Sequence, residues 1–330
     1  MLYTLNPKLL IKRIAENIWH IYNPNTMRHY KVGKDEIMLL KQLKAPCTIN
    51  KLSSIFPQLT KKELENAINQ LVSLNLVCQN GKTKKIKLNK LTKFYLLRIN
   101  TSLLTRNLFT ITYQWILTIT SIISTLCIVY AYVKGFKISE LIKYNTSLSS
   151  MGLLFLFTII TLILHELSHG ILAINQNAMV PEMGLLVYFM MPTGFADVTG
   201  IKFNGTNMQK LTVMLGGLLI NFCIVGISLF LWISNLRNSI IAALILSNLG
   251  IIIFNLSFFI KLDGYYILEL ILHEDYLFDK SLKYVLDKRK KIDYEGIPKD
   301  EKIFYRVFGT LSVIFIPLLL ANIIFSFFRL

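Results

Sequence analysis

Two histidines and a glutamate lie within five consecutive positions of an otherwise apolar segment. His165 and His169 are four residues apart, so on a helix they share one face and can both reach one metal ion. Glu166, between them, is placed to take a proton from a water molecule that such a metal activates. The surrounding residues 151–174 contain no other formally charged side chain. Because ionisable groups at membrane depth are costly and usually functional, the pattern predicts a metal centre inside a membrane helix.

A catalytic metal centre needs a third ligand from elsewhere in the chain. Catalytic zinc usually takes three protein ligands and keeps a fourth position open. The best candidate is Asp263, expected at the end of the fourth apolar segment and, by the distribution of charge, at the same membrane face as the histidines. Gly264 would permit a backbone bend that turns this carboxylate inward. Two imidazoles and a carboxylate suit zinc (Zn2+); the alternative is an ordinary acid at a helix end.

The composition is that of a membrane protein. Of the 330 residues, 53% are hydrophobic, and the mean hydropathy is +0.51. We expect a polytopic α-helical membrane protein with about five transmembrane helices, a re-entrant strand or hairpin, and an N-terminal soluble winged-helix-like α/β domain. The expected spans are residues 108–133, 151–174, 211–233, 239–260 and 304–328. The expected domains are a cytoplasmic domain (1–98), a membrane core (99–272), a charged cytoplasmic segment (273–303) and a C-terminal transmembrane helix (304–330).

The charge distribution indicates how the chain is oriented. Residues 1–106 hold 19 Lys and Arg but five Asp and Glu, a net charge of +14 out of +17. We therefore expect a multi-pass protein of the cell membrane with a cytoplasmic N-terminus beside an anionic leaflet. No aromatic and basic motif supports nucleic-acid binding, so no nucleic acid is expected as a partner. The four cysteines form no Cys-x-x-Cys pair, which excludes a zinc ribbon or redox motif.

The first 98 residues show the pattern of a small α/β domain. Asn23-Pro24-Asn25 predicts a turn between strands 19–22 and 29–32. Helices are expected at 35–43 and 48–56, and a third follows the capping box Thr60-x-x-Glu63. Asn80-Gly81 predicts a hairpin between strands 76–79 and 84–88. Three short helices followed by a two-stranded wing are typical of a winged helix.

A short segment between the second and third spans is bounded by Pro and Gly. Residues 181–192 are too few to cross a bilayer as a helix, and they predict a strand or re-entrant hairpin beside the active site. An edge of this kind can hold an extended peptide by strand addition, with Gly184, Leu185 and Val187 as substrate-binding residues. The alternative is a loop on the membrane surface. Asp197 follows the segment and is not expected to be a ligand.

Two motifs in this order resemble the site-two protease family of intramembrane zinc metallopeptidases. They are His-Glu-Leu-Ser-His-Gly at 165–170 and Leu-Asp-Gly-Tyr-Tyr at 262–266, and the resemblance covers about residues 151–272. It implies His165, His169 and Asp263 as zinc ligands and Glu166 as the catalytic acid and base. The segment 216–221 matches the family's Gly-Pro-x-x-Asn pattern in part, with leucine in place of proline. By that match Asn221 orients the substrate; the alternative is an interhelical hydrogen bond.

The N-terminal domain resembles the PqqD-like peptide-recognition domains of systems that mature ribosomally made peptides. The resemblance rests on Asn23-Pro24-x-Thr26, Tyr30-x-Val32 and the order of helices and wing, over about residues 15–90. It implies binding of a leader peptide at a strand edge; the alternative is a module that docks or dimerises. Together the two resemblances imply a zinc endopeptidase that cleaves membrane-associated or leader-bearing peptides. Regulated cleavage of a membrane-bound signalling protein, a non-catalytic exporter or immunity protein, and a DNA-binding membrane sensor are the alternatives.

Overall fold

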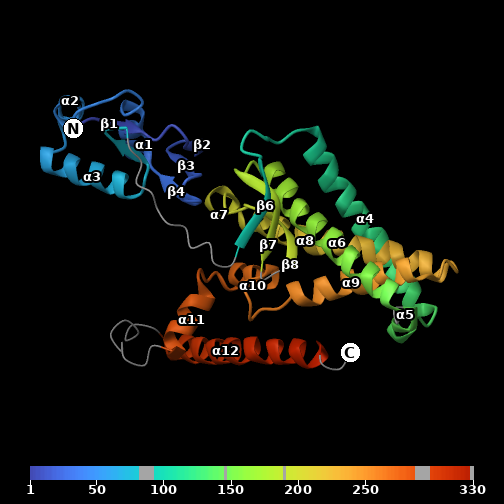
Figure 1. The fold of residues 1–330 in the computed structure, drawn as a ribbon. Helices are drawn as coiled ribbons and strands as arrows, with labels where there is room; N and C mark the ends of the chain where they lie inside the picture. Colours follow the sequence, from blue (N-terminus) through green and yellow to red (C-terminus); the bar gives the residue numbers. More distant parts are fainter. Residues whose placement is uncertain (82–92, 145–146, 189–190, 287–297, 328–330) are drawn as a thin grey trace. The chain divides into compact units, whose positions relative to one another are not determined.

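The computed structural model describes residues 1–330 except 82–92, 145–146, 189–190, 287–297 and 328–330 (Figure 1). The chain divides into two compact units, each of which is described by itself. The first consists of residues 1–112 and 170–206, and the second of residues 113–169 and 207–330. This division differs from the predicted domains, because residues 170–206 pack with the N-terminal part of the chain.

The first unit begins with short strands followed by three helices. The predicted hairpin is confirmed: strands β3 (Ile18–Asn23) and β4 (Arg28–Val32) are antiparallel, with Tyr22 opposite His29. A strand that the sequence analysis missed, β2 (Leu10–Ala15), pairs with β3 on the other side. The three predicted helices are also present, as α1 (Lys34–Gln42), α2 (Ile49–Ile55) and α3 (Lys61–Ser73).

Helix caps and apolar side chains explain why these helices form and pack. The Thr60 side chain accepts from the backbone N–H of Glu63, and Glu63 accepts from the backbone of Thr60, which is the predicted capping box. Each helix then turns an apolar stripe inward. The centre of the core is made of side chains with no exposed surface, namely Leu40, Leu43, Leu52, Leu64 and Ile68.

The expected wing is present only in part among the described residues. Strand β5 (Val77–Gln79) pairs with β1 (Tyr3–Leu5) at the N-terminus of the chain. Asn80 and Gly81 have positive φ angles of 50° and 72°, as a tight hairpin turn requires. The second predicted strand, 84–88, lies outside the described residues. Strand β1 is the partner of β5 among the described residues, and the two-stranded wing stays a prediction.

A third antiparallel sheet belongs to the first unit. Strand β7 (Glu182–Tyr188) pairs with β8 (Met191–Ala196), so the predicted hairpin in this region is confirmed. Strand β7 also pairs with β6 (Lys93–Asn100) on its other side, which gives the order β6–β7–β8. The predicted domain boundary at residue 98 falls inside β6 of this sheet. The short helix α7 (Ile201–Asn204) follows.

Long apolar helices dominate the second unit. Among the described residues, three helices are long and apolar enough to cross a membrane: α4 (Leu108–Val133), α6 (Leu148–Asn175) and α8 (Asn207–Ile233). Their most apolar stretches differ in burial, with 61% of the α8 stretch buried against 17% for α4 and for α6. Helix α8 is therefore the central packing element. Its Val225, Leu229 and Trp232 pack against apolar side chains of α9 (Ser239–Asn255).

The fourth predicted span is shorter than expected. Helix α9 ends at Asn255 and has 17 residues, whereas the prediction extended to residue 260. Its last turn is tightened, because the Ser257 N–H donates to the Phe254 carbonyl three residues earlier. A separate helix, α10 (Asp263–Leu272), then begins.

The remaining helices complete the second unit. The region predicted as a fifth span is helical in α12 (Lys299–Phe327), but this helix is not one of the three candidates for crossing a membrane. A fifth span therefore stays a prediction. Two short helices, α5 (Ile138–Tyr144) and α11 (Leu277–Leu286), occupy other connections between the long ones.

Candidate metal site

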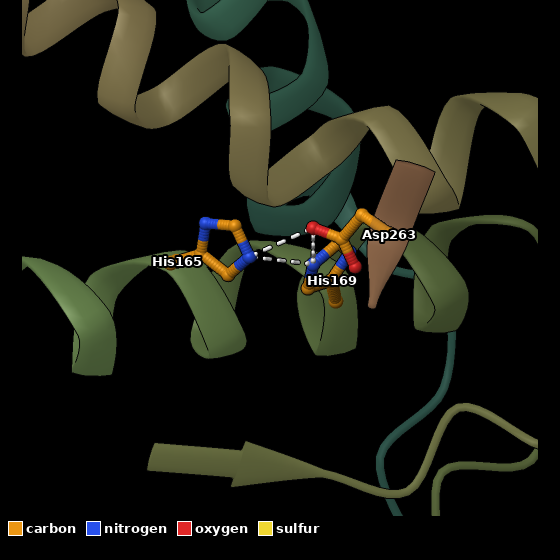
Figure 2. A group of neighbouring side chains, drawn as sticks. All are labelled: His165, His169 and Asp263. Atoms are coloured by element: carbon orange, nitrogen blue, oxygen red, sulfur yellow. Dashed lines mark hydrogen bonds and ion pairs between the residues drawn. The ribbon is translucent and has the colours of Figure 1, made fainter. Parts of the chain in front are cut away.

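Three predicted ligands meet within the second unit (Figure 2). His165 and His169 lie one turn apart on α6, and Asp263 is the first residue of α10. The Oδ2 atom of Asp263 is 2.9 Å from His165 Nε2 and 3.3 Å from His169 Nε2, and the two Nε2 atoms are 3.2 Å apart. This is the one group of His, Cys, Asp or Glu side chains with metal-ligand spacing that the described residues contain.

The chemistry of these atoms favours a cation between them. His169 directs Nδ1 at the backbone carbonyl of Val213, 2.6 Å away, and its N–H donates there. In the neutral ring this leaves the Nε2 lone pair facing the other two candidate ligands. Electron-rich atoms at this separation repel unless a proton or a metal ion lies between them. The arrangement therefore could hold one metal ion through two imidazole nitrogens and a carboxylate oxygen.

Helix α8 orients the histidine-bearing face of α6. Besides the contact of His169 with Val213, the Ser168 hydroxyl donates to the Gly216 carbonyl at 2.8 Å. Ser168 and His169 are almost completely buried, with 0% and 5% of their surface exposed. A carbonyl that accepts from the outer ring nitrogen of a metal ligand fixes the tautomer and the direction of the ring. The sequence analysis missed this role of α8.

A glycine makes room for the ring of His165. A Cβ atom added to Gly217 would lie 2.5 Å from both Cδ2 and Cε1 of His165, which is far closer than real carbon contacts. Only glycine therefore allows the helix backbone to lie against this ring. The Nδ1 atom of His165 is buried with no hydrogen-bond partner among the described residues. In the sequence, the signal of this close contact is the pair Gly216-Gly217.

The third ligand reaches the site in a different way from the one expected. Asp263 was predicted at the end of the fourth span; instead it opens α10 after a break in the chain. Gly264 was expected to supply a bend, yet its φ angle is not in the positive region. An added Cβ there would lie 2.6 Å from the Leu256 carbonyl oxygen, so Gly264 permits close backbone packing. The helix break, not a bend at glycine, directs the carboxylate.

The predicted catalytic and substrate-orienting side chains lie on the same two helices. Glu166 is half-buried next to His165 on α6. Asn221 lies four residues after Gly217 on α8, so the two share a face of that helix. Asn221 has no exposed surface, and neither its Oδ1 nor its Nδ2 has a partner among the described residues. The expected alternative, an interhelical hydrogen bond by Asn221, is therefore absent from the described structure.

The three other predicted substrate contacts lie on a strand without a free edge. Gly184, Leu185 and Val187 are in β7, whose backbone pairs with β6 on one side and with β8 on the other. An added Cβ at Gly184 would collide with the Leu97 carbonyl of β6, which explains glycine at this position. Among the described strands of this sheet, the outer edges of β6 and β8 are the unpaired ones. Strand addition on β7 itself would first require one neighbour to leave.

Asp197 pairs with His29 in the first unit and is not part of the metal-ligand group. Comparison of the chain with protein-family models, curated proteins and solved structures finds no match.

Proposed function

We propose that this protein is a membrane-embedded zinc metalloendopeptidase. Its substrates would be membrane-associated or leader-bearing peptides, and its role the maturation of a ribosomally made secreted peptide. The observation that carries the proposal is that Asp263, more than 90 residues later in the chain, meets His165 and His169 at ligand spacing. A buried group of this kind is costly without a counter-ion, so a purely structural origin is a weaker explanation.

The donor set fits zinc. Two imidazoles and one carboxylate are the ligands of several catalytic zinc sites, in which a fourth position stays open. When bound, zinc would polarise a peptide carbonyl and make water a better nucleophile. Glu166 would accept the proton of the attacking water and deliver it to the leaving amine. The buried Asn221 amide would donate to the substrate, which would give its unpaired polar atoms a partner.

The surroundings of the site suit a peptide substrate near a membrane. Three long apolar helices support an embedded protein, and the basic first third of the chain supports a cytoplasmic N-terminus. By the resemblance of its sequence to peptide-recognition domains, the N-terminal domain would bind a leader peptide. Substrate, bilayer and leader are the partners of the proposal, and nucleic acid is not among them.

Replacement of Glu166 by glutamine tests the proposal. The variant keeps the size of the side chain and all three ligands, so bound metal should stay at about one ion per chain. Peptide cleavage should fall by about 10²–10⁴-fold, because the general base is lost. Glu140→Gln is the matched control, since this acid pairs with Arg237 on an exposed part of α5. Mass spectrometry of secreted and membrane peptides from cells with each variant would identify the trimmed product.

The outcomes separate the proposal from its alternatives. A peptide trimmed by the wild type and by Glu140→Gln, but not by Glu166→Gln, supports the endopeptidase and names its substrate. If that substrate is a membrane-anchored signalling protein, the activity stands and the maturation role is wrong. Equal peptide profiles for all three proteins, with metal bound, would favour the exporter or immunity alternative. A wild-type protein that binds no metal would contradict the proposal outright.

A further inference from the structure

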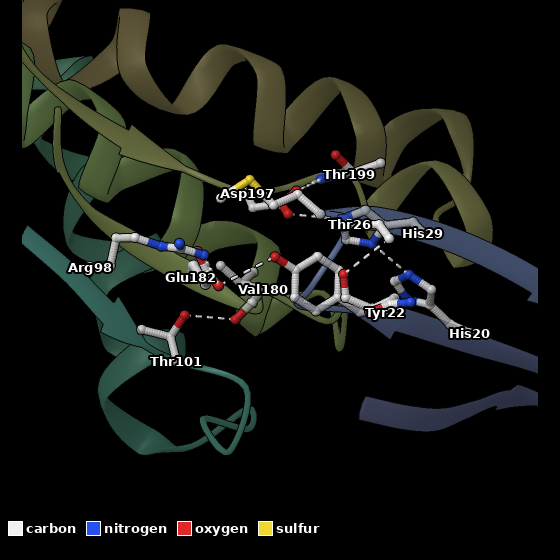
Figure 3. A network of polar contacts seen from close by, with 12 residues as sticks. His20, Tyr22, Thr26, His29, Arg98, Thr101, Val180, Glu182, Asp197 and Thr199 are labelled. Atoms are coloured by element: carbon white, nitrogen blue, oxygen red, sulfur yellow. Dashed lines mark hydrogen bonds and ion pairs between the residues drawn. The ribbon is translucent and has the colours of Figure 1, made fainter. Parts of the chain in front are cut away.

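Within the first unit, a buried polar cluster joins the sheet β2–β3–β4, called the N-terminal sheet below, to the sheet β6–β7–β8 (Figure 3). Two acids form its centre. Glu182 is the first residue of β7, and Asp197 directly follows β8. They lie side by side, because the Asp197 N–H donates to the Glu182 carbonyl at 2.9 Å. Both acids contact side chains of β3 and β4, so the start of β7 and the end of β8 face the N-terminal sheet.

The first bridge is a chain of three side chains. The Oδ2 atom of Asp197 is 2.8 Å from His29 Nε2, and His29 Nδ1 is 2.8 Å from His20 Nε2. His29 donates from Nε2 to the carboxylate, so its Nδ1 accepts from the Nε2–H of a neutral His20. The other carboxylate oxygen of Asp197 accepts from the Thr199 backbone N–H at 3.3 Å. The side chains of His20 and His29 are almost fully buried.

The hydrogen bond between His29 and His20 cannot form when both histidines are protonated. Two N–H groups would then face each other across the 2.8 Å contact. Burial, together with the neighbouring His29 and Lys12, lowers the pKa of His20 to about 4, although Asp197 acts in the opposite direction. The remaining face of the His20 ring lies against Phe203 of α7, with ring centroids 4.8 Å apart. Burial alone would raise the pKa of Asp197, but the bonds from His29 and Thr199 lower it.

The second bridge uses the other acid. The hydroxyl of Tyr22, a buried residue of β3, donates to Glu182 Oε1 at 3.3 Å. Arg98 of β6 forms an ion pair with the same carboxylate, in which Nε donates to Oε2 at 2.7 Å. Glu182 therefore joins the N-terminal sheet and β6 at one point. A shift of β7 by one residue would turn Glu182 to the opposite face of the sheet, so the contact specifies the register.

We propose that Glu182 and Asp197 are positioning residues that latch β7 and β8 to the N-terminal sheet. A peptide bound by the N-terminal domain would then reach β7 and β8 at a fixed number of residues from its bound segment. This consequence for a peptide rests on the proposed function. Buried polar pairs of this kind contribute little net stability but can select one arrangement among several. The latch would thus set which bond of a leader-bearing substrate is cleaved.

Hydrogen exchange of the full-length protein in detergent tests the latch itself. Asp197→Ala removes the acceptor of His29, and exchange of the β4 amides and of the Asp197–Thr199 turn should rise about tenfold or more. Asp197→Asn should keep most of the protection, because its amide oxygen can still accept from His29. Asp279→Asn, which breaks the exposed pair with Lys261, is the control and should leave the first unit unchanged. Equal protection in wild type and Asp197→Ala would overturn the latch.

Digestion of a leader-bearing peptide tests its consequence. The wild type should cut one bond, whereas Asp197→Ala should spread cleavage over several bonds; Asp197→Asn should restore the single site. If Asp197→Ala loosens the domain in exchange yet cuts the same single bond, the positioning role is wrong. If the wild type cuts no peptide while exchange responds as expected, the latch is supported and the proposed function fails.

Discussion

Replacement of Gly217 by alanine tests whether the site depends on close contact between α8 and the ring of His165. The added Cβ would lie 2.5 Å from two ring carbons, and ordinary contact begins at 3.4 Å, so the ring or the helix must move by about 1 Å. Metal–ligand distances tolerate roughly 0.2 Å. Overpacking of a buried site costs about 1–3 kcal/mol. If that cost falls on the bound state, metal affinity drops about 5- to 150-fold.

The assay is metal occupancy at buffered free zinc, measured by elemental mass spectrometry on purified protein. Gly217→Ala is compared with Gly152→Ala on the same helix as the histidines and with Gly250→Ala on α9. An added Cβ meets no atom within 4 Å at either control position. Both controls should bind zinc as the wild type does, and the gain in helix propensity should leave them at least as stable.

Two results would refute this reasoning. Wild-type affinity in Gly217→Ala would mean that the His165 ring does not lie against the α8 backbone when metal is bound. Equal losses in all three variants would mean that any added methyl group weakens the helix bundle. A loss confined to Gly217→Ala, with a normal melting profile for the apo protein, is the expected result.

Two further predictions concern other buried polar groups. Asn221→Ala removes an amide whose polar atoms have no partner among the described residues, so Tm should stay the same or rise, while cleavage falls at least about tenfold. A lower Tm with unchanged cleavage would point to a structural role. Stability of the first unit should decrease as pH falls from about 6.5 toward 4, because unfolded chains bind the proton that buried His20 excludes. Thermal unfolding at pH 7 and pH 5 measures this loss, which His20→Asn should reduce; an unchanged loss in that variant would assign it to other groups.

The grouping of the three candidate ligands was predictable from the sequence, but the contacts that hold them in place were not. The spacing of His165 and His169 fixes a shared helix face, and the charge distribution pointed to Asp263. The contacts of α8 depend on how that helix is rotated about its axis. Because α8 is apolar around its whole circumference, no polar stripe indicates which side faces α6. The contact of Val213 could therefore not be assigned from the sequence, and Gly216-Gly217 indicated a close approach without naming the ring that Gly217 admits.

The fold shows the same division between local and distant signals. The helices around Leu40, Leu52 and Leu64 follow from caps and local periodicity, and their prediction is confirmed. Strand β6 was missed because its partner is β7, about 90 residues later, and because a bulge between Tyr95 and Leu97 interrupts the alternation of its side chains. Pairing over such a distance leaves no local pattern.

Several locally unfavourable features of the second unit coincide near the candidate metal site. Helix α9 ends at Asn255 inside an apolar stretch, although a longer helix would give more backbone N–H and C=O groups a hydrogen-bond partner. The break places Asp263 in the first turn of α10, where the helix dipole stabilises a carboxylate. Gly217 weakens α8 but admits the His165 ring, and Asn221 is buried with no partner in the part of the chain that the structure describes. Since proteins retain such costs mainly where function requires them, their concentration on α6, α8 and α10 argues for chemistry at this site rather than for an accidental cluster.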